Sequence, residues 1–262
     1  MGSATTQART ATSEALASTS GVDLDVAREL FAAVGAVSGS AQLSGALSDS
    51  SAPAAARAAL VSGVFGSSYR PATVALLTGA AQQRWSNSSE FVEGLEELAV
   101  RATAVAETND IEPELFSFSR TVAANGELEL ALGGRLGDAS AKGSLVSTLL
   151  DGRVSAGTAL IVSSLVQNAR GRRVRALLRR AERIVADQRA RIVATVYAAA
   201  PLSAEQQTRL QNALSARYGS AVTLNTVIDP TVVGGLRVQV ADDVIDASVS
   251  ARLADLRQRI AG

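Results

Sequence analysis

The chain has 262 residues and a mass of 26.8 kDa, which is enough for one large domain or two small ones. Apolar residues make up 47% and aromatic residues only 3%, a composition that favours packed helices over a β-sandwich. Cysteine and histidine are absent, which excludes disulfides, thiolate zinc sites and every catalytic triad or metal site that needs imidazole.

The net charge is zero, but the charges are unevenly distributed. Residues 1–150 carry nine basic and sixteen acidic side chains, whereas residues 151–262 carry sixteen basic and nine acidic ones. Such polarisation bears on partners rather than on fold. No apolar run approaches the roughly 18 residues of a membrane span, and the polar segment 1–17 lacks the apolar core of a signal peptide. We therefore expect neither a membrane span nor a signal peptide.

Helical periodicity dominates the sequence from its start to about residue 190. The pattern predicts a helix that starts at Asp23 or Asp25 and is followed by a Ser/Gly-rich break. Pro71 stands where the first turn of a later helix tolerates proline. Ser88 or Ser89 is expected to cap a helix whose early glutamates suit the positive end of the helix dipole.

The helical pattern then repeats further along the chain. Glu29-Leu30-Phe31 recurs as Glu114-Leu115-Phe116, an offset of 85 in residue number, and Leu60-Val61-Ser62 recurs as Leu145-Val146-Ser147 in the same ungapped register. We interpret this as an internal duplication, the alternative being chance matching of two Ala/Leu-rich stretches. Shifting residues 4–19 by the same offset lands on 89–104, so one helix is a candidate for closing the first bundle and opening the second.

The pattern changes character after about residue 190. Period-2 alternation predicts strands at 191–199, 222–228 and 236–240, with a short strand at 244–245. Ser203 with Gln206 is a capping-box signal for an intervening helix, and Gly219 is a plausible stop. Apolar spacing predicts a final helix through about residue 260.

The predicted fold is therefore mostly α, with two tandem related helical bundles followed by a small C-terminal α/β domain of order β-α-β-β-α. The expected domains are residues 1–109, 110–190 and 191–262, and helix 89–108 is the one that the two bundles could share.

Nine arginines fall within residues 170–191. One interpretation is an electrostatic footprint for nucleic acid or anionic lipid. The other is a solvated or partner-facing surface whose charges meet acidic neighbours. The absence of aromatic or base-reading groups favours the second.

Other polar groups form no recognisable catalytic, cofactor or metal site. Asp242, Asp243 and Asp246 fit no calcium loop, and turn and cap chemistry explains them. The paired glycines lack the Lys-Ser/Thr tail of a phosphate loop, and the serines have no histidine base. The sequence describes an adaptor better than an enzyme.

The C-terminal segment resembles a family signature. A strand ending at Asp229-Pro230, a Gly-Gly pair, an alternating strand, and then Val-Ile-Asp-x-Ser-Val and Arg-Leu resemble the ATP synthase delta subunit family, which includes the oligomycin-sensitivity-conferring protein. The residues that carry the resemblance are Asp229, Gly234, Gly235, Val244, Ile245, Asp246, Ser248, Val249, Arg252 and Leu253. Ordinary members are near the size of residues 90–262, so the chain looks like the longer actinobacterial form with a duplicated bundle.

The resemblance implies a non-catalytic stator subunit of the F-type ATP synthase that binds no cofactor or metal. In the family, the helical bundle binds the head, made of alpha and beta subunits, and the C-terminal domain holds the b-type stalk. It implies no nucleic acid, a membrane reached only through the complex, and a place at the cytoplasmic face of the bacterial cell membrane. The partner contacts expected by analogy are Phe91, Leu95, Leu98, Ile161, Leu165, Leu236, Val238 and Leu256. The alternative function is an Arg-rich adaptor for nucleic acid or anionic membrane.

Overall fold

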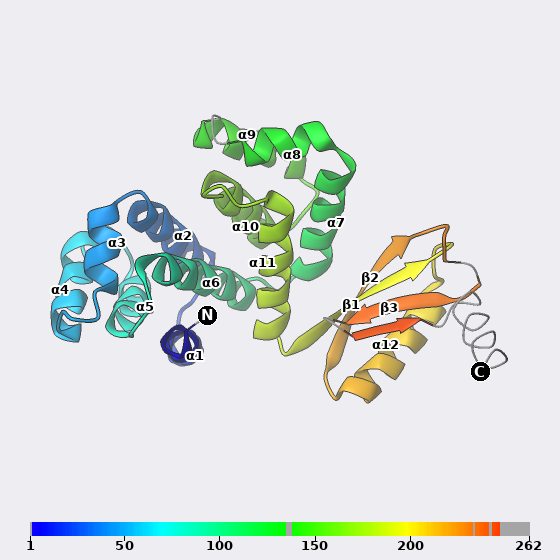
Figure 1. Cartoon of the computed structure of the whole chain (residues 1–262), viewed down its shortest axis with the longest axis horizontal. Coiled ribbons are helices and arrows are strands. Elements are labelled where there is room, and N and C mark those ends of the chain that lie inside the picture. The colour runs from blue at the N-terminus through cyan, green and yellow to red at the C-terminus, as the bar shows by residue number, and fades with distance from the viewer. Residues whose placement is uncertain (1, 135–137, 233, 241–242, 247–262) are drawn as a thin grey trace, which may run out of the picture. The chain divides into compact units, whose positions relative to one another are not determined.

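The computed structural model describes residues 2–134, 138–232, 234–240 and 243–246. The chain divides into two units, Met1–Val185 and Ala186–Gly262. The first unit is built of helices, and the described part of the second combines a sheet with one helix (Figure 1). The mostly α fold with a small C-terminal α/β domain is thus confirmed.

The helices of the first unit follow one another in two matching series. The first series is α1 (Ser3–Ser18), α2 (Leu24–Ser38), α3 (Ala41–Ser48), α4 (Ala54–Phe65), α5 (Pro71–Gln82) and α6 (Ser88–Ala106). The second continues with α7 (Ile111–Ala124), α8 (Gly126–Gly133), α9 (Ala139–Leu150), α10 (Ala156–Gln167) and α11 (Val174–Gln188). Adding 85 to the bounds of α3, α4 and α5 gives the bounds of α8, α9 and α10 without any difference.

Helix α6 belongs to both series. The offset carries α1 onto the start of α6, and it carries α6 onto α11. Helix α6 contacts α1, α2, α3 and α5, which precede it in the sequence, and α10, which follows it. Eleven of its 19 residues are buried, against four of 16 in α1, as expected for a helix enclosed on several sides. We call α1–α6 the first copy and α6–α11 the second copy.

A carboxylate contact recurs in both copies. Glu29 of α2 accepts hydrogen bonds from the N-cap backbone N–H of α5, at 2.9 Å, and from the Thr73 hydroxyl. Glu114, which is equivalent to Glu29 at the offset of 85, accepts from the N-cap N–H of α10, at 3.0 Å, and from the hydroxyls of Ser155 and Thr158. Each carboxylate satisfies donors that a helix N-terminus leaves open and sits at the positive end of the helix dipole.

The helix starts follow side-chain capping. Asp23 caps α2 by accepting from the backbone N–H groups of Asp25 and Val26. For α6 the predicted caps lie too far along the chain: Asn87 accepts from the Glu90 N–H at 2.8 Å, and Ser88 and Ser89 lie inside the first turn.

The Ser/Gly-rich segment after α2 is helical where the sequence predicts a break. It contains the short helix α3, where Ser40 accepts from the Leu43 N–H at 3.2 Å. In the second copy Asn125 accepts in the same way from the Leu128 N–H and starts α8. Helices this short show too few turns for a periodic pattern, so capping and packing decide their existence.

The second unit contains a four-stranded sheet. Its strands are β1 (Arg191–Ala198), β2 (Ala221–Ile228), β3 (Leu236–Val240) and β4 (Asp243–Asp246), in the order β2-β1-β3-β4. Strand β2 runs parallel to β1, whereas β3 is antiparallel to both β1 and β4. The parallel pair requires a crossover, which α12 (Ala204–Tyr218) supplies.

Helix α12 starts and ends as the sequence predicts. Ser203 and Gln206 form a capping box with both hydrogen bonds present, and Gly219 adopts the left-handed backbone at φ 70°. Leu214 of α12 packs with Val196 of β1 and other residues in the core of the unit. The expected final helix near 249–260 lies outside the described residues. Among the described helices none is by itself long and apolar enough to cross a membrane. Helices α2 and α3 together have the length and apolar composition, but the chain bends by 106° between them.

Candidate functional site

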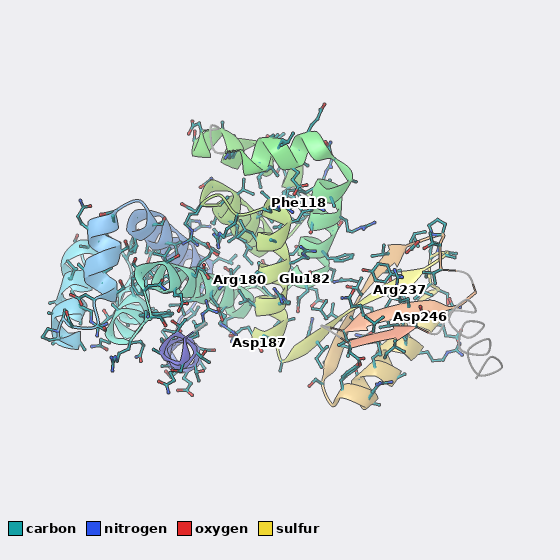
Figure 2. All side chains as sticks on the ribbon, viewed as in Figure 1. Phe118, Arg180, Glu182, Asp187, Arg237 and Asp246 are labelled. Carbon is teal, nitrogen blue, oxygen red and sulfur yellow. The ribbon has the colours of Figure 1, made fainter. Side chains whose placement is uncertain are left out.

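The signature segment of the second unit begins with a turn organised by Asp229. Its carboxylate accepts from the Thr231 hydroxyl at 2.6 Å and from the Thr231 N–H at 3.0 Å. These two bonds, aided by the charge of Arg237, hold the pKa of Asp229 below its ordinary value. Arg237, which is labelled in Figure 2, lies over the ring of Tyr197, and the distance to the ring centroid is 4.6 Å. Asp229 therefore fixes the turn after β2.

Gly234 and Gly235 bring the chain into β3. Their φ angles are 63° and 149°, in the region that disfavours residues with a Cβ atom. Both glycines therefore shape the bend, so their role in the family signature is structural.

Strands β3 and β4 carry the other signature residues that the structure describes and two of the predicted partner contacts, Leu236 and Val238. Leu236 and Ile245 pack against the sheet core and Val238 is buried in it, so these three have little surface for a partner. Val244 is 54% exposed, and Asp246 is exposed at the end of β4. Five predicted residues lie outside the described part of the chain: Ser248, Val249, Arg252, Leu253 and Leu256.

The predicted partner contacts of the helical unit are buried in the described structure. All five side chains are 0–3% exposed and belong to the helical core; they are Phe91, Leu95, Leu98, Ile161 and Leu165. Helix α6 is enclosed by helices of both copies, so its apolar residues meet the chain itself. In this structure these residues offer a partner no surface.

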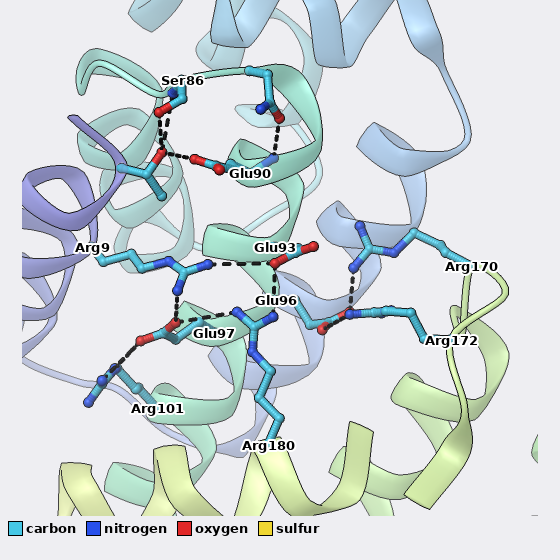
Figure 3. A network of polar contacts seen from close by, with 12 residues as sticks. Arg9, Ser86, Glu90, Glu93, Glu96, Glu97, Arg101, Arg170, Arg172 and Arg180 are labelled. Carbon is cyan, nitrogen blue, oxygen red and sulfur yellow. Dashed lines mark hydrogen bonds and ion pairs between the residues drawn. The ribbon is translucent and has the colours of Figure 1, made fainter. Parts of the chain in front are cut away.

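Three glutamates of α6 instead form the centre of an ion-pair network (Figure 3). Glu96 is only 4% exposed, and it accepts from Arg170 at 2.7 Å and from Arg172 at 2.6 and 2.8 Å. Both arginines belong to the turn between α10 and α11, where Arg170 and Gly171 have φ angles of 52° and 77°. A left-handed arginine is strained, and its ion pair with Glu96 offsets that cost.

The other two glutamates join α1 to α11. Glu93 and Glu97 each pair with Arg9 of α1, at 3.6 and 3.5 Å, and with Arg180 of α11, at 2.9 and 3.6 Å. Arg101, one turn along α6, adds a pair with Glu97 at 3.0 Å. The network therefore connects the first helix of the first copy to the last helix of the second through the helix they share.

The network determines the charge state of Glu93. Burial raises the pKa of this carboxyl, but the hydrogen bond and charge of Arg180, with the charges of Arg172 and Arg170, outweigh burial and hold the pKa below its ordinary value. Glu93 is thus stabilised as an anion, which suits an ion pair and not a general acid.

Four of the nine arginines of the segment 170–191 pair with glutamates of the chain itself. Arg170 and Arg172 pair with Glu96, Arg180 pairs with two glutamates of α6, and Arg175 pairs with Glu129 of α8 at 2.9 Å. Charges neutralised inside the chain are not available to phosphates, which counts against the nucleic-acid and lipid alternative. The sequence favours charges that meet acidic neighbours, but it does not identify these acids, although the glutamates at the start of α6 stand at spacings of three, three and one.

No reactive constellation occurs in the described part of the chain. A shallow hollow of about 590 Å³ lies where α1 ends and α5 begins, and Arg70 is the one ionisable residue of its lining. Arg70 is already paired with Asp23, Asp25 and Glu29. Among the described residues no group of three or more acidic side chains is placed to hold a metal ion.

Comparisons with known proteins place these features in a family. The family described as ATP synthase delta (OSCP) subunit matches residues 92–260. A protein of Leifsonia xyli named "ATP synthase subunit delta" is 46% identical over 265 aligned positions, covering the whole of both chains. Proteins with the same name from Streptomyces avermitilis and Beutenbergia cavernae are 40% and 38% identical and cover 95% and 91% of this chain. The first copy, which mostly precedes the family match, is therefore also aligned in these relatives.

Proposed function

The chain belongs to the ATP synthase delta (OSCP) family, and we propose from this membership how its two units work. The protein is a non-catalytic stator subunit of an F-type ATP synthase, which links the catalytic head to the peripheral stalk so that rotor torque is coupled to ATP synthesis. The observation that carries this function is the 46% identity to an ATP synthase subunit delta over the full length of both chains.

The helical unit contacts the head, formed by alpha and beta subunits, and the α/β unit contacts a b-type stalk subunit. The signature segment supports the second contact, because it leaves Val244 exposed on the edge strand β4. Leu256 stays part of this proposal, whereas the five apolar residues of α6 and α10 predicted for the head contact are buried in the described structure. A stator under torque needs slowly dissociating interfaces, so residence time matters more than association rate.

The protein reaches the membrane only through this complex, at the cytoplasmic face of the bacterial cell membrane. An internal ion-pair network suits the role, since a subunit that transmits force has to hold its own shape. Four arginines of the segment 170–191 are also neutralised by the chain's own glutamates, which supports a protein-binding role over nucleic-acid binding.

Reconstitution tests the stator role directly. Membranes carrying the cognate synthase are stripped of this subunit, and ATP-driven proton pumping is measured before and after the full chain is added back. We expect the full chain to restore pumping without hydrolysing ATP by itself. Equal pumping with and without the chain would contradict the proposal. Calorimetric titration with a peptide from the N-terminus of the alpha subunit, with a scrambled peptide as control, then tests the head contact.

A further inference from the structure

One stripe of α11 is only partly neutralised within the chain. Arg175, Arg179 and Arg183 follow one another at spacings of four and four, which places them along one side of the helix. Arg175 pairs with Glu129 of α8. Arg179 and Arg183 continue the stripe, are exposed, and have no described carboxylate within ion-pair distance.

The duplication shows what this side of the helix does elsewhere. The positions on α6 that correspond to Arg179 and Arg183 at the offset of 85 are Gly94 and Leu98, and both are buried. The side that packs against other parts of the chain on α6 is therefore exposed and basic on α11. Two like charges at i and i+4 also destabilise an isolated helix, so folding alone gives no reason for them.

We propose that Arg179 and Arg183 form a docking surface for an acidic helix of a neighbouring subunit of the synthase. The occupant is a helix with carboxylates one turn apart, because the two open arginines are one turn apart and Arg175 of the same stripe is met by a glutamate carried on helix α8. This inference rests on the proposed function, since it takes the partner from the same complex.

The same surface suits nucleic acid and lipid less well. A protein that binds DNA through its backbone makes about 6–10 phosphate contacts, and the open part of this stripe supplies two arginines. Helix α11 contains no aromatic residue for stacking on bases or for inserting at a membrane interface. A pair of protein carboxylates matches the size and charge of the surface.

Charge reversal in the full chain tests the proposal. The variant Arg179→Glu/Arg183→Glu is compared with wild type for binding to the synthase head lacking this subunit and to the soluble part of the b-type stalk. The matched control is Arg28→Glu/Arg120→Glu, which changes the charge equally at two exposed arginines on other helices of the helical unit, one of them paired only with Asp25. Arg179→Lys/Arg183→Lys keeps the charge. Circular dichroism and Trp85 fluorescence check that each variant is folded.

We expect the reversal to weaken binding to either the head or the stalk about tenfold, mainly through slower association, and wild-type binding to weaken between about 0.05 and 0.5 M salt. The control and the lysine variant should stay within about twofold of wild type. Unchanged affinity of the reversed variant for both partners would overturn the inference, as would a loss confined to phosphatidylglycerol vesicles or duplex DNA. If wild type binds neither head nor stalk, the proposed function itself fails.

Discussion

Glu96 is the residue of the helical unit whose replacement should disturb its electrostatics most. It is almost fully buried and holds two arginines that are themselves about three-quarters buried. Replacing one partner of a buried ion pair leaves the other charges uncompensated. We expect Glu96→Ala to lower the free energy of unfolding by about 2–4 kcal/mol, discounted for the partial exposure of the arginines. Urea unfolding followed by the fluorescence of Trp85, the single tryptophan, measures this.

Glu205→Ala is the control for this prediction, because its pair with Arg209 is mostly exposed. Exposed ion pairs contribute about 0–1 kcal/mol, so the control should leave unfolding nearly unchanged. A Glu96→Ala protein as stable as the control would show that the network is not a structural centre.

Gly94 is required by the close approach of an indole ring. A Cβ atom at this position would lie 2.1 Å from Cη2 of Trp85, and Trp85 is fixed by a hydrogen bond from its indole N–H to the Ala80 carbonyl at 2.8 Å. We expect Gly94→Ala to destabilise the unit by about 1–3 kcal/mol, as overpacking does, and to shift the Trp85 emission.

Gly63 of α4 provides the matched comparison, since a Cβ atom there meets nothing within 4 Å. Gly63→Ala should stabilise the unit by about 0.5–1 kcal/mol through helix propensity. Thermal unfolding of both variants measures whether each substitution raises or lowers the stability of the unit. Equal effects at both glycines would contradict the packing argument.

The lowered pKa of Glu93 predicts a dependence of stability on acid. Since the folded state holds this carboxyl below its ordinary pKa, the stabilisation is fully present above the unfolded pKa of about 4.3 and is lost as the pH falls through the folded value. Glu93→Gln should therefore flatten the fall in the urea midpoint between about pH 5 and pH 3 relative to wild type. If the urea midpoint of the variant falls with pH as steeply as that of wild type, other carboxyls cause the fall.

At the scale of elements, the duplicated carboxylates allow an internal comparison. Glu29 and Glu114 occupy equivalent places and bind equivalent helix starts, so we expect Glu29→Gln and Glu114→Gln to cost similar amounts, about 1–2 kcal/mol each. The two sites share no partner, so the double variant should lose the sum. Chemical denaturation of the three variants measures this, and costs that differ several-fold would mean that the contacts are equivalent only in geometry.

The sequence predicts the long, capped and periodic elements of this fold well. Capping chemistry predicts the start of α2 at Asp23 or Asp25, of which Asp23 is the cap, and both ends of α12, and the offset of 85 carries enough apolar pairs to indicate the repeat. The short helices α3 and α8 are not predicted, because about two turns cannot display a helical period. Their existence depends on a capping side chain and on tertiary packing, which a local pattern does not contain.

The candidate site was less predictable for a different reason. The family signature is recognisable because its glycines and turn residues are local in sequence, as at Asp229 and Gly234. The contacts expected by analogy at Phe91, Leu95 and Leu98 fall on buried side chains, because α6 is packed against α1, α2, α3 and α5 as well as α10. Burial of a shared helix depends on helices that are distant in the sequence, which no pattern within α6 reveals.

For the whole helical unit, the shared helix implies that the two copies unfold together. Helix α6 contributes buried residues to a core that includes residues of both copies, from Leu30 of α2 to Leu115 of α7. Neither copy can lose α6 without exposing the core of the other. We therefore expect one cooperative transition for Met1–Val185 rather than two.

Leu30→Ala and Leu115→Ala test this coupling, because the two leucines are equivalent at the offset of 85 and are 1% and 0% exposed. Each truncation should cost about 2–5 kcal/mol. Trp85 belongs to the first copy, where it packs edge-to-face on Phe91 of α6. If the copies unfold as one body, Leu115→Ala lowers the urea midpoint reported by Trp85 fluorescence as much as Leu30→Ala does. If the Trp85 midpoint responds only to Leu30→Ala while circular dichroism shows a second, earlier transition in Leu115→Ala, the copies are separate domains and α6 does not couple them.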